Sequence, residues 1–183
     1  MKKTRHVVIA AAAVALLGSY AAHGDESERS VGEYTDDKLL VGKVKSALVS
    51  DDTTDAGEIN VEAYKGVVQL NGFVDNEKEK ARAAEVAKAV TGVKGVENNL
   101  QIKQASQTTG GVIDDSTITA KVKSALIESP ETKAGDIKVE TRAGVVQLSG
   151  FVSSEEQKNA AAKIAQSVAG VKSVANALSV KPK

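Results

Sequence analysis

The chain has 183 residues, with 24 Lys+Arg against 24 Asp+Glu, no Cys and no Trp, and its only histidines are His6 and His23. This charge balance argues against nucleic acid as the main partner, because phosphate binding needs a basic face. Without Cys, and with both histidines near the start, most of the chain lacks a thiol nucleophile, a histidine base and a Cys/His metal cage. We therefore expect neither an enzyme nor a protein with a cofactor or metal site.

The first residues have the order of a secretory signal. Three cationic residues precede an apolar run of eleven, Val7 to Leu17, and small residues follow it. The run is shorter than the roughly 20 residues that span a bilayer, so we expect a signal peptide at 1–21, cleaved after Ala21 or alternatively after Gly24. Loss of the three cations leaves a net charge of 21 − 24 = −3. No Cys follows the run, so we expect a released periplasmic protein and not a lipoprotein.

An internal repeat organises the rest of the chain. Residues 36–103 align with residues 114–181 at a constant offset of 78, with 35 identities in 68 positions and no gap. Identity at this level predicts two copies of one folding unit, produced by duplication. The segment between them is polar and ends in glycine, as flexible linkers do, and the segment before them is polar and expected to be disordered. The predicted boundaries are a tail at 22–34, a first unit at 35–103, a linker at 104–112 and a second unit at 113–183.

Each unit begins with a predicted helix, at Asp36–Leu48 and at Asp114–Ile127. Paired aspartates at its start suit a helix N-terminus. Apolar residues recur at helical spacing and form one stripe. The stripe consists of Leu40, Val44, Ala47 and Leu48 in the first unit and of Ile118, Val122, Ala125 and Leu126 in the second.

A β-hairpin follows the helix. Ile59 and Val61 alternate with polar residues, as in a half-buried strand, and a turn at Gly66 leads into the segment 67–74. The stretch GVVQLNGFV here recurs as GVVQLSGFV at 144–152. We expect each copy to need this stretch for its own sheet core. Glycine at position 72 is expected to leave room for the close approach of a helix.

A second helix and a last strand complete each unit. The helix is predicted at 76–90 and 154–168, with an alanine-rich inner stripe that permits tight packing on the sheet. The order α-β-β-α-β predicts an α/β (α+β) unit with a three-stranded mixed sheet, a right-handed crossover and both helices on one face. Asn98 and Asn176 share the inward side of the last strand with apolar residues. We expect their side chains to bond nearby backbone groups.

These motifs resemble those of a known family. DDSTITAKVKSAL at 114–126, GVVQLSGFV at 144–152 and GVKSVANALSV at 170–180 are similar to the BON domains of bacterial envelope proteins. The resemblance covers nearly all of the chain after the signal, although the first copy reads DDKLLVGKVKSAL where the second is rich in Thr. It implies a soluble envelope protein of the osmotic-stress type that binds phospholipid, with no catalytic residues to carry over.

Lysines beside the first helical stripe are the candidate contact residues. They are Lys43 and Lys45 in the first unit and Lys121 and Lys123 in the second. Their aliphatic stems are expected to lie along the apolar stripe while the amines reach outward. Such a pair is either a solvated face or a cradle for anionic phospholipid headgroups, each lysine contributing about 1 kcal/mol near an anionic surface.

Two further apolar residues, Leu39 and Val41, stand where the second unit has Thr117 and Thr119. They are predicted to lie off the core stripe and to contact the other unit, a protein partner or acyl chains. This leaves a second functional hypothesis open, a chaperone-like protein that shields unfolded or outer-membrane protein clients with these residues and its hairpin edges. In either case we expect a monomer.

The acidic segment 50–62 superficially resembles a calcium-binding loop. Counted from Asp51, its sixth residue is Ala56, where such a loop needs glycine, and Gly57 comes one place late. The second copy has fewer acidic residues in this segment. The sequence therefore predicts an acidic surface loop and no metal site.

Overall fold

The structure is a computed structural model that describes residues 31–103 and 114–182, with side chains from residue 36 onward. The predicted signal peptide, most of the predicted tail and the predicted linker lie outside these residues. Within the described ranges, no helix is both long and apolar enough to cross a membrane.

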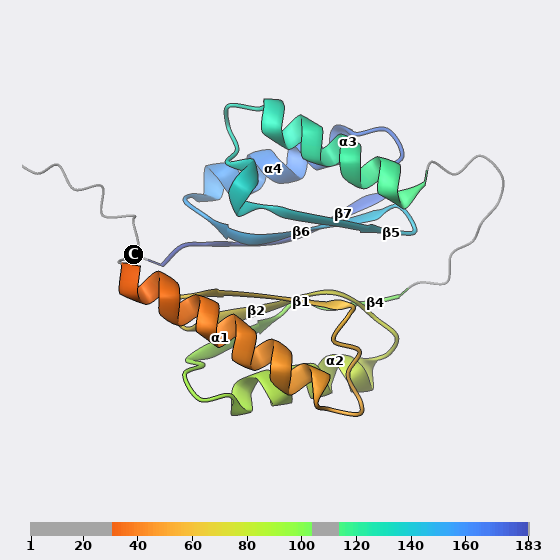
Figure 1. Ribbon diagram of the computed structural model, residues 1–183. Coiled ribbons are helices and arrows are strands. Elements are labelled where there is room, and N and C mark those ends of the chain that lie inside the picture. Colours follow the sequence, from red (N-terminus) through yellow and green to blue (C-terminus); the bar gives the residue numbers. More distant parts are fainter. Residues whose placement is uncertain (1–30, 104–113, 183) are drawn as a thin grey trace, which may run out of the picture.

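The described residues form two units with the same architecture (Figure 1). The first contains α1 (Val31–Val49), β1 (Ile59–Tyr64), β2 (Val67–Val74), α2 (Glu77–Ala89), β3 (Gly95–Asn98) and β4 (Gln101–Ile102). The second contains α3 (Asp115–Glu128), the 3-10 turn η1 (Ala134–Asp136), β5 (Lys138–Arg142), β6 (Val145–Val152), α4 (Glu155–Ser167) and β7 (Ser173–Val180). The predicted α-β-β-α-β order is confirmed.

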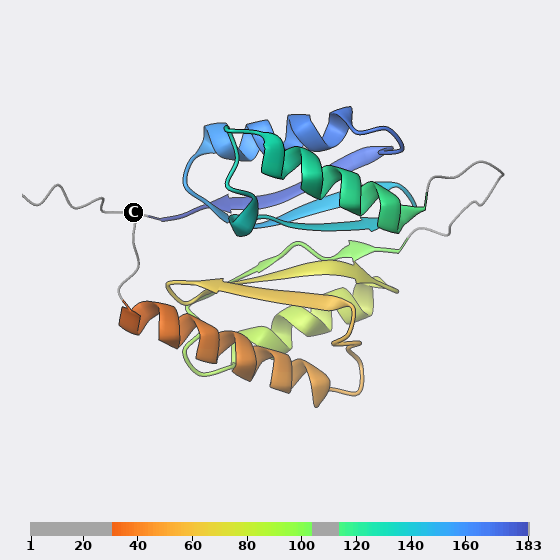
Figure 2. The same ribbon diagram turned by 45° about the horizontal axis from the view of Figure 1, so that its top comes forward.

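Each sheet is mixed, as predicted. β2 pairs antiparallel with β1 and parallel with β3 and β4, while β6 pairs antiparallel with β5 and parallel with β7. Both helices of a unit cover the same face of its sheet (Figure 2). The last strand is continuous in the second unit but is divided into β3 and β4 in the first.

The predicted helical stripes form the two cores. In α1 the residues Leu40, Val44 and Leu48 are buried, and in α3 the residues Ile118, Val122 and Leu126 are buried. Each set belongs to a separate hydrophobic cluster that contains residues of its own unit only. Each unit therefore has its own core.

The inward asparagines behave as predicted. The Asn98 side chain donates to the Lys80 carbonyl at 2.8 Å, and that of Asn176 donates to the Lys158 carbonyl at 3.1 Å. Both carbonyls belong to the helix that packs on the sheet. The amides thus tie the last strand to the second helix of each unit.

The start of the first helix differs from the prediction. α1 begins at Val31, so residues 31–34 belong to a helix and not to a disordered tail. Asp36 and Asp37 therefore lie inside α1 and do not mark its N-terminus. The prediction holds in the second unit, where Asp114 caps α3 by accepting a hydrogen bond from the Ser116 N–H at 3.0 Å.

The two sheets face each other, with the helices on the outside (Figures 1 and 2). The side of β2 that points away from its own core is buried as well, because Gln69 and Asn71 have no exposed surface. In β6, Gln147 is 1% exposed and Ser149 is 3% exposed. The repeated stretch therefore serves two surfaces, the core of its own unit and the interface with the other.

The expected role of Gly72 is wrong. A Cβ at this position would lie 2.1 Å from the carbonyl oxygen of Glu58, which is a backbone group beside the hairpin and not a helix. The φ angle of Gly72 is +127°, a conformation that side chains disfavour. Glycine is required here because the backbone of Glu58, which leads into β1, occupies the space that a side chain would fill.

Candidate functional site

The N-terminal half of α1 is fixed against the hairpin turn. The Asp37 carboxylate accepts hydrogen bonds from the N–H groups of Lys65 at 2.8 Å and Gly66 at 3.0 Å. Both turn residues have positive φ, 50° and 85°, as a two-residue type I′ turn requires. Asp115 bonds Ala143 and Gly144 in the same way at 2.7 and 2.8 Å. One carboxylate per unit, buried in the first unit and half-buried in the second, therefore places the turn beside the helix.

This arrangement builds a groove of about 310 Å³ between α1, the hairpin turn and the loop that leads to β3. Leu39, Lys43, Lys65 and Lys94 line it. Gly66 lets the Lys94 stem lie across the turn, since a Cβ at Gly66 would come within 3.0 Å of that stem. Three lysines thus line the same groove as the exposed Leu39.

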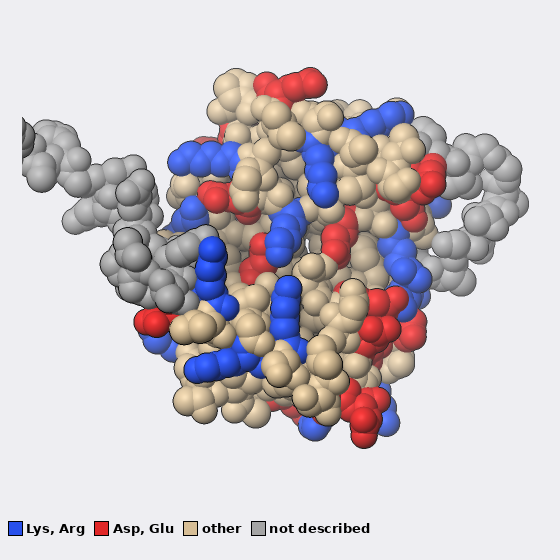
Figure 3. All heavy atoms as spheres, in the orientation of Figure 1, with Lys and Arg blue, Asp and Glu red and all other residues tan. Residues whose placement is uncertain are grey.

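Two acidic residues also line the groove, and only one of them is exposed. Asp37 is 4% exposed, and its carboxylate bonds the turn, while Asp36 is exposed. Figure 3 shows Lys and Arg side chains gathered on the front of the lower unit, over α1, with Asp and Glu side chains mainly toward the side where α1 ends. The groove is therefore a positively charged surface with an apolar centre.

The structure brings together only part of the predicted contact set. Leu39 is 59% exposed and meets Lys43 in the groove. Val41 and Lys45 lie on the opposite flank of α1, because two positions along a helix correspond to a rotation of about 200°. Val41 packs against the core of the first unit, so the prediction that it lies off the core is wrong. Lys43 and Lys45 do not form one cradle.

Sequence reasoning missed Lys65 and Lys94. They are distant from α1 in the chain and reach it only because Asp37 holds the turn against the helix. The available signal was a lysine beside each of two glycines, in Tyr64-Lys65-Gly66 and in Lys94-Gly95. Glycine-containing turns of this kind are common, so the signal has little specificity.

The second unit lacks two of the residues that line the groove in the first unit. At the offset of 78, Leu39 and Lys65 correspond to Thr117 and Ala143, while Lys43 corresponds to Lys121. Lys123 lies close enough to Glu140 to act on its carboxyl group electrostatically. The combination of an exposed leucine and three lysines therefore belongs to the first unit.

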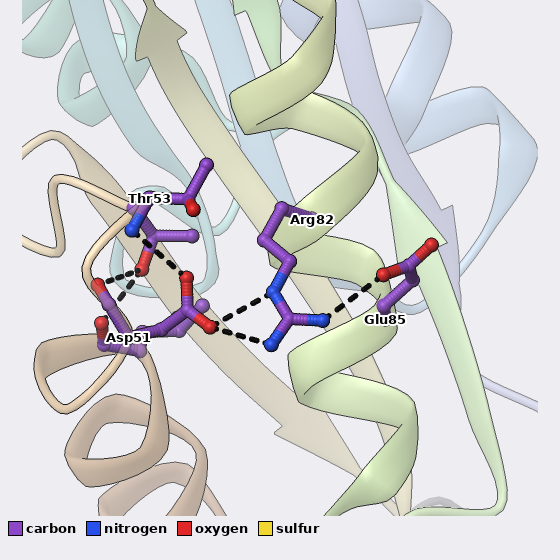
Figure 4. A network of polar contacts seen from close by, with 6 residues as sticks. Asp51, Thr53, Arg82 and Glu85 are labelled. Atoms are coloured by element: carbon purple, nitrogen blue, oxygen red, sulfur yellow. Dashed lines mark hydrogen bonds and ion pairs between the residues drawn. The ribbon is translucent and has the colours of Figure 1, made fainter.

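The acidic loop after α1 is tied to α2 by an ion pair (Figure 4). The Arg82 guanidinium contacts Asp51 at 2.8 Å through two nitrogens and Glu85 at 3.1 Å. The hydrogen bond from Arg82 lowers the pKa of Asp51, and the bonds to both carboxylates raise the pKa of Arg82. In the part of the chain that the structure describes, no group of three or more His, Cys, Asp or Glu residues could hold a metal ion. This geometry favours an acidic surface loop.

Two α-β-β-α-β units packed sheet against sheet, each with its helices outside and a turn held by a carboxylate, define a tandem-domain α+β protein. The chain belongs to the BON domain family, whose model matches residues 36–104 and 114–182.

Three relatives are similar over most of their length. The chain is 36% identical to osmotically-inducible protein Y of Escherichia coli, covering 99% of this chain and 96% of the relative. It is 38% identical to outer membrane lipoprotein DolP of Haemophilus influenzae, covering 86% and 81%. It is 34% identical to a 21 kDa hemolysin of Actinobacillus pleuropneumoniae, covering 83% and 80%.

Proposed function

We propose that this protein is a non-enzymatic periplasmic protein of the envelope-stress type that binds anionic phospholipid surfaces through the groove beside α1. The observation that carries the proposal is the exposed Leu39 surrounded by Lys43, Lys65 and Lys94. The names of two relatives, osmotically-inducible protein Y and outer membrane lipoprotein DolP, support the envelope and the stress response as the setting.

The expected binding is weak and sensitive to salt. Each lysine near an anionic surface contributes about 1 kcal/mol, and Leu39 adds apolar surface that enters the boundary between headgroups and acyl chains. Exposed charges act over a screening length of about 8 Å at physiological ionic strength. Raising the salt concentration well above the physiological value is therefore expected to lower the bound fraction.

One membrane contacts one unit at a time. The helices of the two units lie on opposite outer faces of the molecule (Figure 1). A flat bilayer cannot touch both helical layers at once, so the second unit adds no avidity on the same surface. This favours the first unit, which has the leucine and the additional lysine.

Flotation with vesicles of phosphatidylcholine, with and without phosphatidylglycerol, tests the proposal. Lys43→Glu with Lys65→Glu should abolish binding to the anionic vesicles. Lys121→Glu with Lys123→Glu makes the same charge change in the second unit and should leave most binding intact. Leu39→Thr, which introduces the residue of the second copy, should weaken binding at every salt concentration. Equal loss from both lysine pairs would contradict a site in the first unit.

A second candidate function is the shielding of unfolded or outer-membrane protein clients. β1 and β5 are edge strands in their sheets, and edge strands pair readily with extended segments. Suppression of the aggregation of an unfolded outer-membrane protein tests this function. Leu39→Ser is the informative variant, because Val41→Ser would also disturb the core. Suppression without vesicle binding would favour this function over the first.

A further inference from the structure

The interface between the sheets has approximate twofold symmetry. The Gln147 side-chain oxygen accepts a hydrogen bond from the Gly72 N–H at 2.6 Å, and that of Gln69 accepts one from the Gly150 N–H at 3.2 Å. The offset of 78 exchanges these two contacts. The cross-interface contacts of Asn60 with Glu140 and of Lys138 with Glu62 are related in the same way.

The symmetry fails at one end of the interface. Tyr64 stacks on Phe151 across the interface, with ring centroids 5.4 Å apart, and the two side chains are 3% and 8% exposed. The equivalent pair at the other end is Arg142 and Phe73. Arg142 is exposed and Phe73 is half-buried. Among the described residues, no aromatic ring stacks on Phe73 as Tyr64 does on Phe151.

A cleft of about 340 Å³ lies between the units at this end. Phe73 and Arg142 line it together with Thr119 and Thr141. Phe73 and Arg142 also line a smaller cavity of about 30 Å³. Their side chains therefore lie between the cleft and this cavity. The volume of the larger cleft is within the range of roughly 300–1,000 Å³ found for small-molecule sites.

Arg142 is the positively charged residue of the cleft that can bind a ligand. Glu58 and Glu140 also line it. Glu58 is paired with Lys103, and Glu140 accepts a hydrogen bond from Asn60. Within residues 36–103 and 114–182, Arg142 forms no ion pair. Its guanidinium can therefore bind a planar anion through two parallel hydrogen bonds.

We propose that this cleft binds a small aryl carboxylate. The aromatic ring of the ligand lies on Phe73, in the position that Tyr64 takes against Phe151 at the other end, and the carboxylate binds Arg142. Stacked aromatic rings gain interaction free energy in addition to that from the apolar area they bury. The ligand therefore completes the end of the interface that Arg142 leaves open. Aromatic acids and the C-terminal residue of a chain that ends in Phe or Tyr share this chemistry.

Calorimetric titration of the full-length protein with N-acetylphenylalanine tests the proposal, with the neutral N-acetylphenylalaninamide as the matched ligand. The acid should bind roughly tenfold more tightly than the amide, because the amide loses a hydrogen bond to a charged group. Arg142→Gln should reduce the affinity for the acid by a similar factor. Lys163→Gln, which removes one exposed cation from the outer face of α4, should leave it unchanged.

Arg142→Tyr is the decisive variant. It restores the residue of the first copy, so it should fill the cleft, stack on Phe73, raise Tm and abolish binding of the acid. Binding that survives Arg142→Tyr, or that does not distinguish acid from amide, would overturn the proposal. A peptide ending in phenylalanine separates the two sources: tighter binding than that of the acid assigns the cleft to chain termini, and weaker binding assigns it to free aromatic acids.

Discussion

At the scale of single residues, the two copies of the repeat differ where the molecule is open to ligands. Tyr64 closes one end of the interface, and Arg142 at the equivalent position leaves a cleft. Leu39 gives the α1 groove its apolar centre, whereas the second copy has Thr117. Core positions of the helical stripes stay apolar in both copies. The two copies therefore differ at the surface and at the interface between the units, and they agree in their cores.

The Asp51–Arg82 pair predicts acid sensitivity that can be assigned to one contact. The pKa of Asp51 is lowered chiefly by the hydrogen bond from Arg82. The contribution of the pair to stability is thus present above the pKa of Asp51 in the unfolded chain and is lost as the pH falls through the lowered pKa. Arg82→Gln should lower Tm at neutral pH and leave it unchanged in strong acid. Thermal unfolding across this range is the measurement.

Glu85→Gln is the matched control, because it removes the other partner of Arg82 and leaves the contact with Asp51 intact. It should keep the acid dependence of the unaltered protein. In an NMR titration, the Asp51 carboxyl should have a higher pKa in Arg82→Gln than in Glu85→Gln. The same pKa in both variants would show that another group lowers it.

Gly72 predicts a severe and specific loss of stability. A Cβ there would meet the Glu58 carbonyl at 2.1 Å, and the φ of +127° is strained for any side chain. Gly72→Ala should therefore reduce the free energy of unfolding by about 2–4 kcal/mol. Gly42→Ala is the control: it lies in α1 with nothing within 4 Å of an added Cβ, and it should stabilise the protein by roughly 0.5–1 kcal/mol. Urea denaturation measures the free energy of unfolding of both variants. A smaller loss for Gly72→Ala than about 2 kcal/mol would show that the backbone at Glu58 shifts easily to admit the side chain.

At the scale of the elements, hydrophobic periodicity predicted the helices, the hairpin and their order, but it missed the start of α1 at Val31. It could not predict the second buried face of β2, because Gln69 and Asn71 look like solvent-facing positions of a half-buried strand. Their burial depends on the other unit, which local sequence does not describe. The groove was predicted in part for the same reason: Leu39 and Lys43 share a helix, whereas Lys65 and Lys94 arrive through a tertiary contact.

The carboxylate that joins α1 to the hairpin turn should contribute to both stability and the groove. Asp37→Ala leaves two turn N–H groups without their acceptor, and we expect a cost of about 1–3 kcal/mol. Amide hydrogen exchange at Lys65 and Gly66 should accelerate more than elsewhere in the hairpin. Asp36→Ala, at the exposed neighbouring position, should change neither quantity. Unaltered exchange in Asp37→Ala would mean that the turn is held by other contacts.

At the scale of the whole molecule, the interface is polar and incompletely bonded. Among the described residues, one side-chain atom of Glu62 and one of Asn71 are buried there without a hydrogen-bond partner. Such groups cost stability, and polar interfaces between domains permit relative motion. The two units are therefore expected to separate under milder conditions than those that unfold their cores.

Glu140 gives this interface a pH dependence of opposite sign to that of Asp51. Burial raises its pKa, with a smaller increase from Glu62, while Asn60, Lys138 and Lys123 act against it. A raised pKa means that its contribution to stability is present below the pKa of the unfolded chain and is lost as the pH rises through the folded value. Glu140→Gln keeps an acceptor for Asn60 and removes the charge. It should raise Tm at neutral pH and have no effect in acid, while Glu128→Gln on the exposed side of α3 should have none at either pH.

The separate cores predict that residues 112–183 fold without the first unit. Their hydrophobic cluster contains no residue of the other unit, so the fragment should show a cooperative thermal transition in circular dichroism. The fragment exposes Gln147 and Phe151, which are buried in the full chain. Gln147 then gains hydration, and Phe151 loses its stacking on Tyr64. With about 4–8 °C per kcal/mol for a domain of this size, its Tm should fall by less than roughly 10 °C relative to the second unit in the full chain.

Phe151→Arg in the full chain removes the ring stack and should bring the second unit close to the Tm of the fragment. A fragment with a random-coil spectrum would show that the polar interface, and not the core, holds the unit together.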